Sequence, residues 1–374
     1  MRIRNCVKIF LKNCVLYSIK MYLCVLEKIN RMNRTKLFFG VAVMLIGSCF
    51  RAEAQDVHFS QYFANPIYLN PAYAGTYICP RVVTNFRLQW PQLSGKYISY
   101  SASYDQHFEK LSGGIGALFM GDRAADGGAI VAHAFSLVYS YNAFLTRSKK
   151  SSMRFAVQAT YQQKHLEWDK MTFEDMIDPK YGFVYHTQEF LPTNTAGVFD
   201  FSTGVIFYSE HYYGGLAVHH FTQPKESFFD NTGKETRIPM KITANFGAIF
   251  DIKQSMKSEK SIGDMSISPN LIFQYQTRFT DGAAYSTINY GMYWSCYPMA
   301  VGAWFRQGFK NADAAIFLVG LEQEHFKIGY SYDFTIPSVD NKPGTGGSHE
   351  VSVVFYLPCP EKSRRIQKIN CPKF

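Results

Sequence analysis

Beyond residue 54 the sequence contains no apolar stretch long enough to cross a membrane as a helix, which takes about 20 residues. It also contains no Cys-x-x-Cys pair, which argues against a zinc ribbon and a thioredoxin-like redox site. Its glycine-rich stretches lack the helix and the lysine of a phosphate-binding loop. These absences argue against helical membrane proteins, small zinc domains and the common nucleotide-binding enzymes.

Net charge is almost absent once the N-terminal part of the chain is set aside. The whole chain carries a formal charge of +10. Residues 1–54 hold ten Lys and Arg against two Asp and Glu, which leaves 29 basic and 27 acidic residues in the rest. A surface so evenly charged does not indicate a polyanionic partner, and we expect no binding of nucleic acid.

A recognisable catalytic or metal-binding pattern is lacking as well. Residues 349–353 begin like the HExxH motif of zinc proteases, but they end in valine and alternate like a strand. No spacing selects a catalytic triad among the five candidate groups at the expected outer rim, which are Asp122, Asp126, His165, Asp169 and His186. We therefore expect no enzyme, no cofactor and no metal.

Residues 32–54 have the three parts of a secretory signal peptide. A positively charged start precedes an apolar run at residues 37–50, which is too short to span a bilayer. Ala52-Glu53-Ala54 supplies a small-residue cleavage site, so we expect cleavage after Ala54. The alternative is a lipoprotein acylated at Cys49. Residues 1–31 are expected to be a spurious or extended leader.

After residue 80 the dominant signal is the alternation of apolar and polar side chains. In residues 326–334 the even positions are all large and apolar or aromatic, whereas the odd positions are polar or small. Successive side chains of a strand point to opposite faces, so each such segment is expected to be a strand with one apolar face. About fourteen segments show this pattern, at residues 81–91, 96–107, 113–121, 129–145, 152–165, 196–209, 212–221, 237–253, 267–279, 283–296, 298–308, 314–322, 325–335 and 349–357.

Three features favour a membrane barrel, apolar on its outside, over a soluble sandwich. Residues 55–374 hold 55 aromatic side chains, many near strand ends, where membrane barrels carry aromatic girdles. Short connections, with residues 254–266 as the exception, alternate with long ones such as residues 166–195 and 336–348, as periplasmic turns and outer loops do. A sheet of this size would expose unpaired edges unless it closed. We predict an all-β transmembrane antiparallel β-barrel of about 14 strands over residues 81–357.

Residues 55–80 precede the first strand and are rich in aromatics. Asn65-Pro66 and Asn70-Pro71 favour extended or turn backbone, because a residue before proline avoids the helical region, and Gly75 allows a left-handed turn. The aromatic side chains are too large to leave in water. We expect an N-terminal periplasmic or plug segment that covers the periplasmic mouth, fills the lumen or docks a periplasmic partner. The candidate residues are Phe59, Gln61, Tyr62, Asn65, Pro66, Asn70, Pro71 and Gly75.

The cysteines beyond the leader are Cys79, Cys296, Cys359 and Cys371. An exported chain can oxidise them, and Cys359 with Cys371 would close a short loop, which makes this pair the candidate disulfide. Unpaired or buried thiols are the alternative. Residues 358–374 form a basic C-terminal tail that is expected in the periplasm, either in contact with a partner or lipid headgroups or simply trailing.

Charged side chains on the polar strand faces predict a packing network inside the barrel. The expected basic members are Arg154, Lys164, Arg278, Arg306 and Lys327, and the acidic ones are Asp105, Asp251 and Asp333. The acidic and aromatic loop at residues 166–195 is longer than ordinary connections, which makes it the best candidate for surface binding, although a variable barrel loop is the plainer interpretation.

The stretch from His58 to Gly75, with the sequence HFSQYFANPIYLNPAYAG, resembles the N-terminal signature of the PorP/SprF family. Residues 207–218 are similar to the central hairpin of that family, residues 329–334 and 349–353 to its last two strands, and residues 370–374 to its chain end. The resemblance covers residues 55–374.

This resemblance implies a non-enzymatic outer-membrane protein of the type IX secretion system and of gliding motility. It implies periplasmic ring components or lipoproteins of that system as partners, together with a secreted adhesin and the lipid bilayer. The alternative is a porin-like barrel that transports small solutes through its centre.

Overall fold

The computed structural model describes residues 57–359, except for gaps at residues 94, 125–127, 146–150, 179, 189–192, 229–236, 254–262, 278–283, 309–311 and 337–345. The expected leader, signal peptide and cleavage site lie outside the described residues, as does the tail beyond Cys359. Within the described part of the chain, no helix is long and apolar enough to span a membrane.

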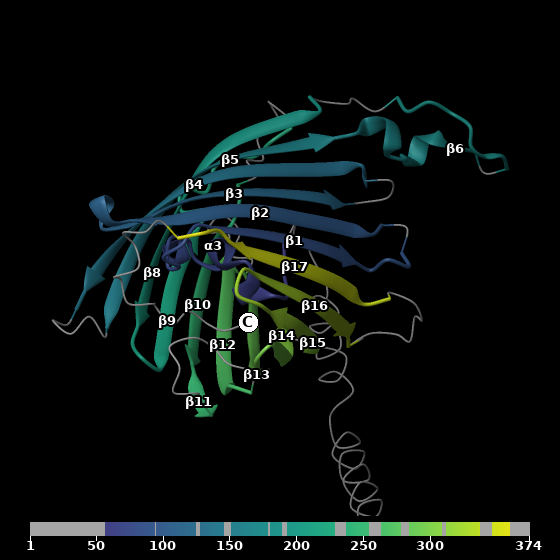
Figure 1. Ribbon diagram of the computed structural model, residues 1–374. Coiled ribbons are helices and arrows are strands. Elements are labelled where there is room, and N and C mark those ends of the chain that lie inside the picture. The colour runs from purple at the N-terminus through teal and green to yellow at the C-terminus, as the bar shows by residue number, and fades with distance from the viewer. Residues whose placement is uncertain are drawn as a thin grey trace, which may run out of the picture. The chain divides into compact units, whose positions relative to one another are not determined.

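Fourteen long strands form one antiparallel sheet that closes on itself (Figure 1), which confirms the predicted barrel. They are β1 (Arg81–Gln89), β2 (Tyr97–Phe108), β3 (Gly113–Ala124), β4 (Ile130–Phe144), β5 (Ser152–Leu166), β8 (Thr195–Tyr208), β9 (Tyr212–His219), β10 (Met240–Ala248), β12 (Met265–Thr277), β13 (Ala284–Cys296), β14 (Met299–Gly308), β15 (Ala312–Glu322), β16 (Phe326–Thr335) and β17 (Ser348–Tyr356). Chain neighbours pair with each other, and the pairing of β1 with β17 closes the ring.

Two details differ from the predicted strands. The segment expected at residues 237–253 is interrupted at Ile249, whose N–H donates to the carbonyl of His211 at 2.8 Å, so that the short strand β11 (Phe250–Lys253) follows β10 as a separate piece. The expected loop at residues 166–195 contains a small hairpin of β6 (Ile177–Asp178) and β7 (Gly182–Phe183). A hairpin of two-residue strands leaves no alternation to detect in the sequence.

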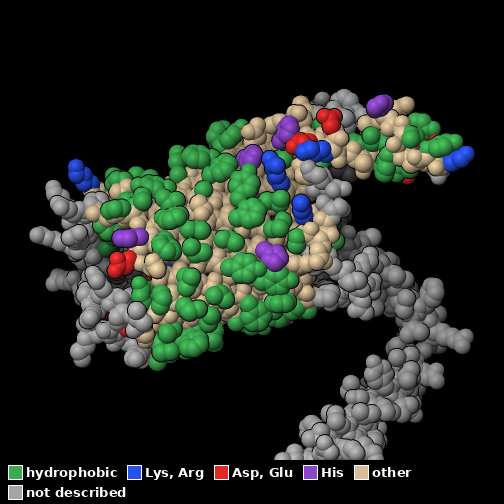
Figure 2. Space-filling model, turned by 45° about the vertical axis from the view of Figure 1, so that its right-hand side comes forward, with side chains coloured by type: hydrophobic (Ala, Val, Ile, Leu, Met, Phe, Trp, Pro, Cys, Tyr) green, Lys and Arg blue, Asp and Glu red, His purple; other side chains and the backbone are tan. Residues whose placement is uncertain are grey.

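The strands have their apolar faces outward and their polar faces inward, as a membrane barrel requires. In β4, Leu137 is 55% exposed, whereas the neighbouring Ser136 is fully buried. Phe135 continues the outward face across the strands, opposite Phe119 on β3 and Tyr161 on β5. Figure 2 shows the resulting band of hydrophobic side chains over one outer face of the barrel. The polar faces of the strands, together with the N-terminal segment, form the interior.

The prediction of a disulfide between Cys359 and Cys371 is wrong, because Cys359 has a different partner. Cys359 is bonded to Cys79, with a Cα–Cα separation of 4.6 Å, and Cys371 lies outside the described residues. Antiparallel pairing places Arg81, the first residue of β1, opposite Tyr356, the last residue of β17. Cysteines just outside these two strand ends therefore meet, although 280 positions separate them in the sequence.

Candidate functional site

The N-terminal residues 57–80, called the lumenal segment below, lie inside the barrel (Figure 1). Two Asn-Pro pairs shape this segment. Pro66 begins the short helix α3 (Pro66–Leu69) and Pro71 begins the 3-10 turn η2 (Pro71–Tyr73), because proline fits the first position of a helix, where no N–H partner is needed. The side-chain oxygen of Asn70 accepts the N–H of Ala72 at 2.9 Å and caps the second turn.

The aromatic side chains of the lumenal segment form the core of the barrel. Phe63 packs against Tyr213, Tyr293 and Trp304, which project inward from β9, β13 and β14, with ring centroids 5.9, 6.4 and 6.1 Å away. Tyr62 also contacts Trp304. The segment therefore replaces the water of an open barrel with an apolar core. Its buried apolar members are Phe59, Tyr62, Phe63, Ile67, Leu69 and Tyr73.

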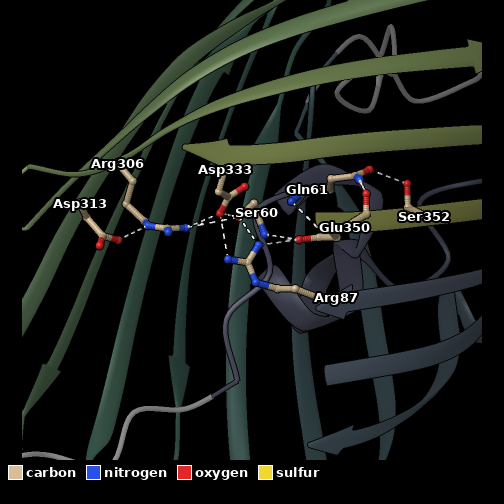
Figure 3. Close-up of polar contacts among 8 residues, drawn as sticks. All are labelled: Ser60, Gln61, Arg87, Arg306, Asp313, Asp333, Glu350 and Ser352. Atoms are coloured by element: carbon tan, nitrogen blue, oxygen red, sulfur yellow. Dashed lines mark hydrogen bonds and ion pairs between the residues drawn. The ribbon is translucent and has the colours of Figure 1, made fainter. Parts of the chain in front are cut away.

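Ser60 and Gln61 bind the barrel wall through Glu350 on β17 (Figure 3). The Glu350 carboxylate accepts the backbone N–H groups of Ser60 at 2.6 Å and Gln61 at 3.1 Å. The Gln61 side chain donates to the backbone carbonyl of Glu350 at 2.9 Å and accepts from the hydroxyl of Ser352 at 2.5 Å. Glu350 and Ser352 thus bind both the backbone of the segment and the side chain of Gln61, so this contact depends on a glutamine at position 61.

A buried charge network surrounds this contact. Arg87 on β1 pairs with Asp333 on β16 at 2.8 Å and with Glu350 at 3.2 Å, and all three side chains are almost completely buried. Arg306 on β14 pairs with Asp333 at 3.3 Å and with Asp313. The hydroxyl of Ser60 lies among these groups, since it donates to Asp333 and accepts from Arg87, both at 2.6 Å. Through Ser60, the network therefore ties the lumenal segment to β1, β14, β16 and β17 on one side of the barrel.

The opposite end of the lumenal segment is bound by backbone contacts. The N–H of Gly75 donates to Asp105 on β2 at 2.7 Å, and the same carboxylate pairs with Arg81 at 2.9 Å. The carbonyl of Ala74 accepts from Arg154 on β5 at 2.7 Å. Between the two ends, Asn65 donates to Ser101 at 2.9 Å. The segment is thus held along its length.

Gly75 leaves no room for a side chain. Its φ of +64° is left-handed, and a Cβ atom there would lie 2.5 Å from the Cα of Gly114 and 3.0 Å from the carbonyl oxygen of Gln106. We expect Gly75→Ala to lower the free energy of unfolding by about 2 to 4 kcal/mol through backbone strain and overpacking. Urea-induced unfolding followed by tryptophan fluorescence measures this. Gly95→Ala is the control, because no atom lies within 4 Å of that position; equal stabilities of the two variants would contradict the close approach.

The structure brings all eight sequence-derived candidates, from Phe59 to Gly75, into the buried lumenal segment. Their role in docking a partner stays a prediction. Among the expected charge pairs, Arg306 does meet Asp333, whereas Asp105 pairs with Arg81 and Lys164 with Glu226. Arg278 lies outside the described residues.

The sequence did not indicate Arg87 or Glu350 as partners of the lumenal segment. The signal available for Glu350 was its position in the alternation, which points it inward while His349 points outward. No group of three His, Cys, Asp or Glu side chains in the described residues is placed to hold a metal ion. Of the rim groups considered for catalysis, Asp122 accepts from Ser99 and His165 contacts Thr195, so the two bind different neighbours.

The loop between β5 and β8 is organised by Asp178. Its carboxylate accepts the N–H groups of Lys180 and Tyr181, both at 2.8 Å, and the hydroxyl of Tyr185 at 2.9 Å. These hydrogen bonds, the one from Lys180 foremost, hold the pKa of Asp178 below its ordinary value. Exposed aromatic side chains, including Tyr181 and Phe183, surround this turn.

The lowered pKa gives the loop a defined dependence on pH. The folded form gains from the ionised carboxylate above the ordinary aspartate pKa of about 3.9, and this gain is lost as pH falls through the lowered pKa. We expect amide exchange in the peptide containing Asp178 to quicken at low pH, after correction for intrinsic exchange. Asp178→Asn should exchange faster at neutral pH and show no such step. Identical exchange profiles for both proteins would contradict this role for the carboxylate.

Comparison with known proteins finds one matching family, whose match covers the N-terminal motif and the strands. The sequence matches the family described as "Type IX secretion system membrane protein PorP/SprF" over residues 51–355. No curated protein matches it.

Similar solved structures include a Pseudomonas aeruginosa FadL homologue (9% identity, 77% of this chain, 92% of that chain, TM-score 0.42). They also include the P. putida toluene transporter TodX (8%, 77%, 92%, 0.44) and the Acinetobacter baumannii outer membrane protein Omp33 (7%, 76%, 100%, 0.39). The match to the family extends over most of the chain and includes both the lumenal segment and the strands that bind it. The chain therefore belongs to the PorP/SprF family of type IX secretion system membrane proteins.

Proposed function

We propose that this chain is a non-enzymatic outer-membrane component of the type IX secretion machinery that supports the secretion or surface attachment of a cargo adhesin, including in gliding motility. Cleavage after Ala54 releases the chain for insertion. The barrel acts through its two exposed ends and through protein partners. Its periplasmic partners are ring components or lipoproteins of the secretion system.

The occupied lumen is the observation that carries this proposal. The lumenal segment fills the interior with aromatic side chains and bonds to β1, β2, β5, β16 and β17. A solute channel needs a hydrated passage. The hydrogen bonds of Ser60 with the buried Arg87, Asp333 and Glu350 oppose displacement of the segment. The filled lumen therefore favours binding of protein partners at the ends of the barrel over transport of solutes through its centre.

Partner contacts fall to surfaces other than the buried part of the lumenal segment, from Phe59 to Gly75. Its eight candidate residues are buried inside the barrel, so in this arrangement they serve as a plug. The loop at residues 167–194, with its exposed aromatics around Asp178, is the surface we assign to the cargo side. The short turns at the other end are the surface we assign to periplasmic components.

The test compares cells that lack this protein with cells complemented by the full chain. Without the protein, we expect the cargo to accumulate in the periplasm and the cell surface to lose it. We also expect a tagged full chain to co-purify with periplasmic components after mild crosslinking. Normal cargo export in the deletion strain, combined with reduced uptake of a small solute, would contradict the proposal and favour the porin-like alternative.

A further inference from the structure

The lumenal segment runs through the barrel in one direction, from one mouth to the other. Its first described residue, Val57, accepts a hydrogen bond from the hydroxyl of Tyr68, which in turn accepts from Lys241 at 3.2 Å. Lys241 is the second residue of β10 and pairs with Gln276 near the end of β12. Val57 therefore lies at the end of the barrel where β10 begins and β12 ends.

Ser60 and Gln61 lie near the same end. Their partner Glu350 is the third residue of β17, and Arg87 is close to the last residue of β1. These strand ends border the connections at residues 336–347 and 90–96. Two independent sides of the barrel thus place the start of the lumenal segment at one mouth.

The end of the segment lies at the other mouth. Asn70 donates to the carbonyl of Val205, three residues before β8 ends, and Gly75 contacts Asp105 near the end of β2. Arg81 and Arg87, which contact the two ends of the segment, are six residues apart on β1. Six strand residues span about 20 Å, so the segment crosses much of the barrel height.

The lengths of the connections tell the two mouths apart. The mouth at Gly75 has the short turns at residues 109–112, 209–211, 297–298 and 323–325, with the connection at residues 249–264 as its long exception. The mouth at Val57 has the longer connections at residues 167–194, 220–239 and 336–347. Outer-membrane barrels have short turns on the periplasmic side and long loops outside.

We propose that the lumenal segment begins at the outer mouth, so that Val57 is reached from the cell surface rather than from the periplasm. The sequence predicts the segment at the periplasmic mouth or in the lumen and indicates no direction for it. This direction rests on the outer-membrane placement proposed above. It makes the beginning of the segment, together with the outer loops, part of the surface that a cargo attached outside would meet.

Cysteine labelling in intact cells tests this. In a Cys296→Ser, Cys371→Ser background, Val57→Cys and the outer-loop variant Phe183→Cys should react with a small membrane-impermeant sulfonated thiol reagent. Lys110→Cys, in the short turn between β2 and β3, should react only after the outer membrane is permeabilised. Labelling of Val57→Cys only after permeabilisation, alongside Lys110→Cys, would overturn the inference.

A second readout does not depend on the reactivity of a single thiol. An epitope inserted directly before Val57 should bind its antibody on intact cells to the same extent as an epitope in the loop at residues 167–194. Binding only after permeabilisation would overturn the inference. Cargo export is measured in the same cells. Normal export, combined with an epitope that binds its antibody only after permeabilisation, would contradict the direction of the segment but not the proposed function.

Discussion

Replacing Arg87 by methionine is expected to lower the free energy of unfolding by about 3 to 5 kcal/mol, the usual cost of removing one partner from a buried ion pair. Arg87 forms ion pairs with both Asp333 and Glu350, and its side chain is 1% exposed. Without it, two buried carboxylates lie close together and Ser60 loses a hydrogen-bond donor. Urea-induced unfolding of the protein reconstituted in lipid measures the change.

Lys170→Met is the matched control for the Arg87 substitution. Lys170 forms an ion pair with Glu167, but its side chain is 44% exposed. Exposed ion pairs contribute about 0 to 1 kcal/mol, so this variant should unfold like the wild type. If both variants lost the same stability, or if neither lost any, the charge network would not anchor the lumenal segment.

The double substitution of Cys79 and Cys359 by serine should also lower the free energy of unfolding by a large amount. Their disulfide links positions 280 apart, and in the chain-entropy description a loop of this length is worth about 5 kcal/mol of folding free energy. Reduction of the wild type should reproduce the effect. Cys296→Ser is the control, since Cys296 is a free thiol.

Peptide mapping of the unreduced protein checks the disulfide directly. Digestion should release a peptide that contains Cys79 joined to one that contains Cys359. A link between Cys359 and Cys371, or no stability difference on reduction, would contradict the bond across the first and last strands.

The strands were predictable because period-two alternation is a local property. The pattern at Phe326–Thr335 fixes both the strand and the face that each side chain occupies, and it holds for most of the barrel. The choice between barrel and sandwich also followed from the sequence, because loop asymmetry and aromatic content are visible in it. The interruption at Ile249 was not visible, since it depends on a hydrogen bond to His211 from another hairpin.

Contacts that arise from closure could not be read from the sequence. The pairing of Cys79 with Cys359 requires β1 and β17 to meet. The hydrogen bond from Ser60 to Glu350 requires the lumenal segment to pass close to β17. The two asparagine–proline pairs did indicate the local turns of the segment. They carried no information about its direction through the barrel.

The central claim is that the lumenal segment closes the barrel, and planar-bilayer conductance tests it most directly. The full chain and a variant that lacks residues 57–76 are purified in detergent and inserted into the same bilayers. We predict no steady conductance for the full chain and a stable open pore for the deletion variant. A steady conductance of the full chain that the deletion leaves unchanged would contradict the claim.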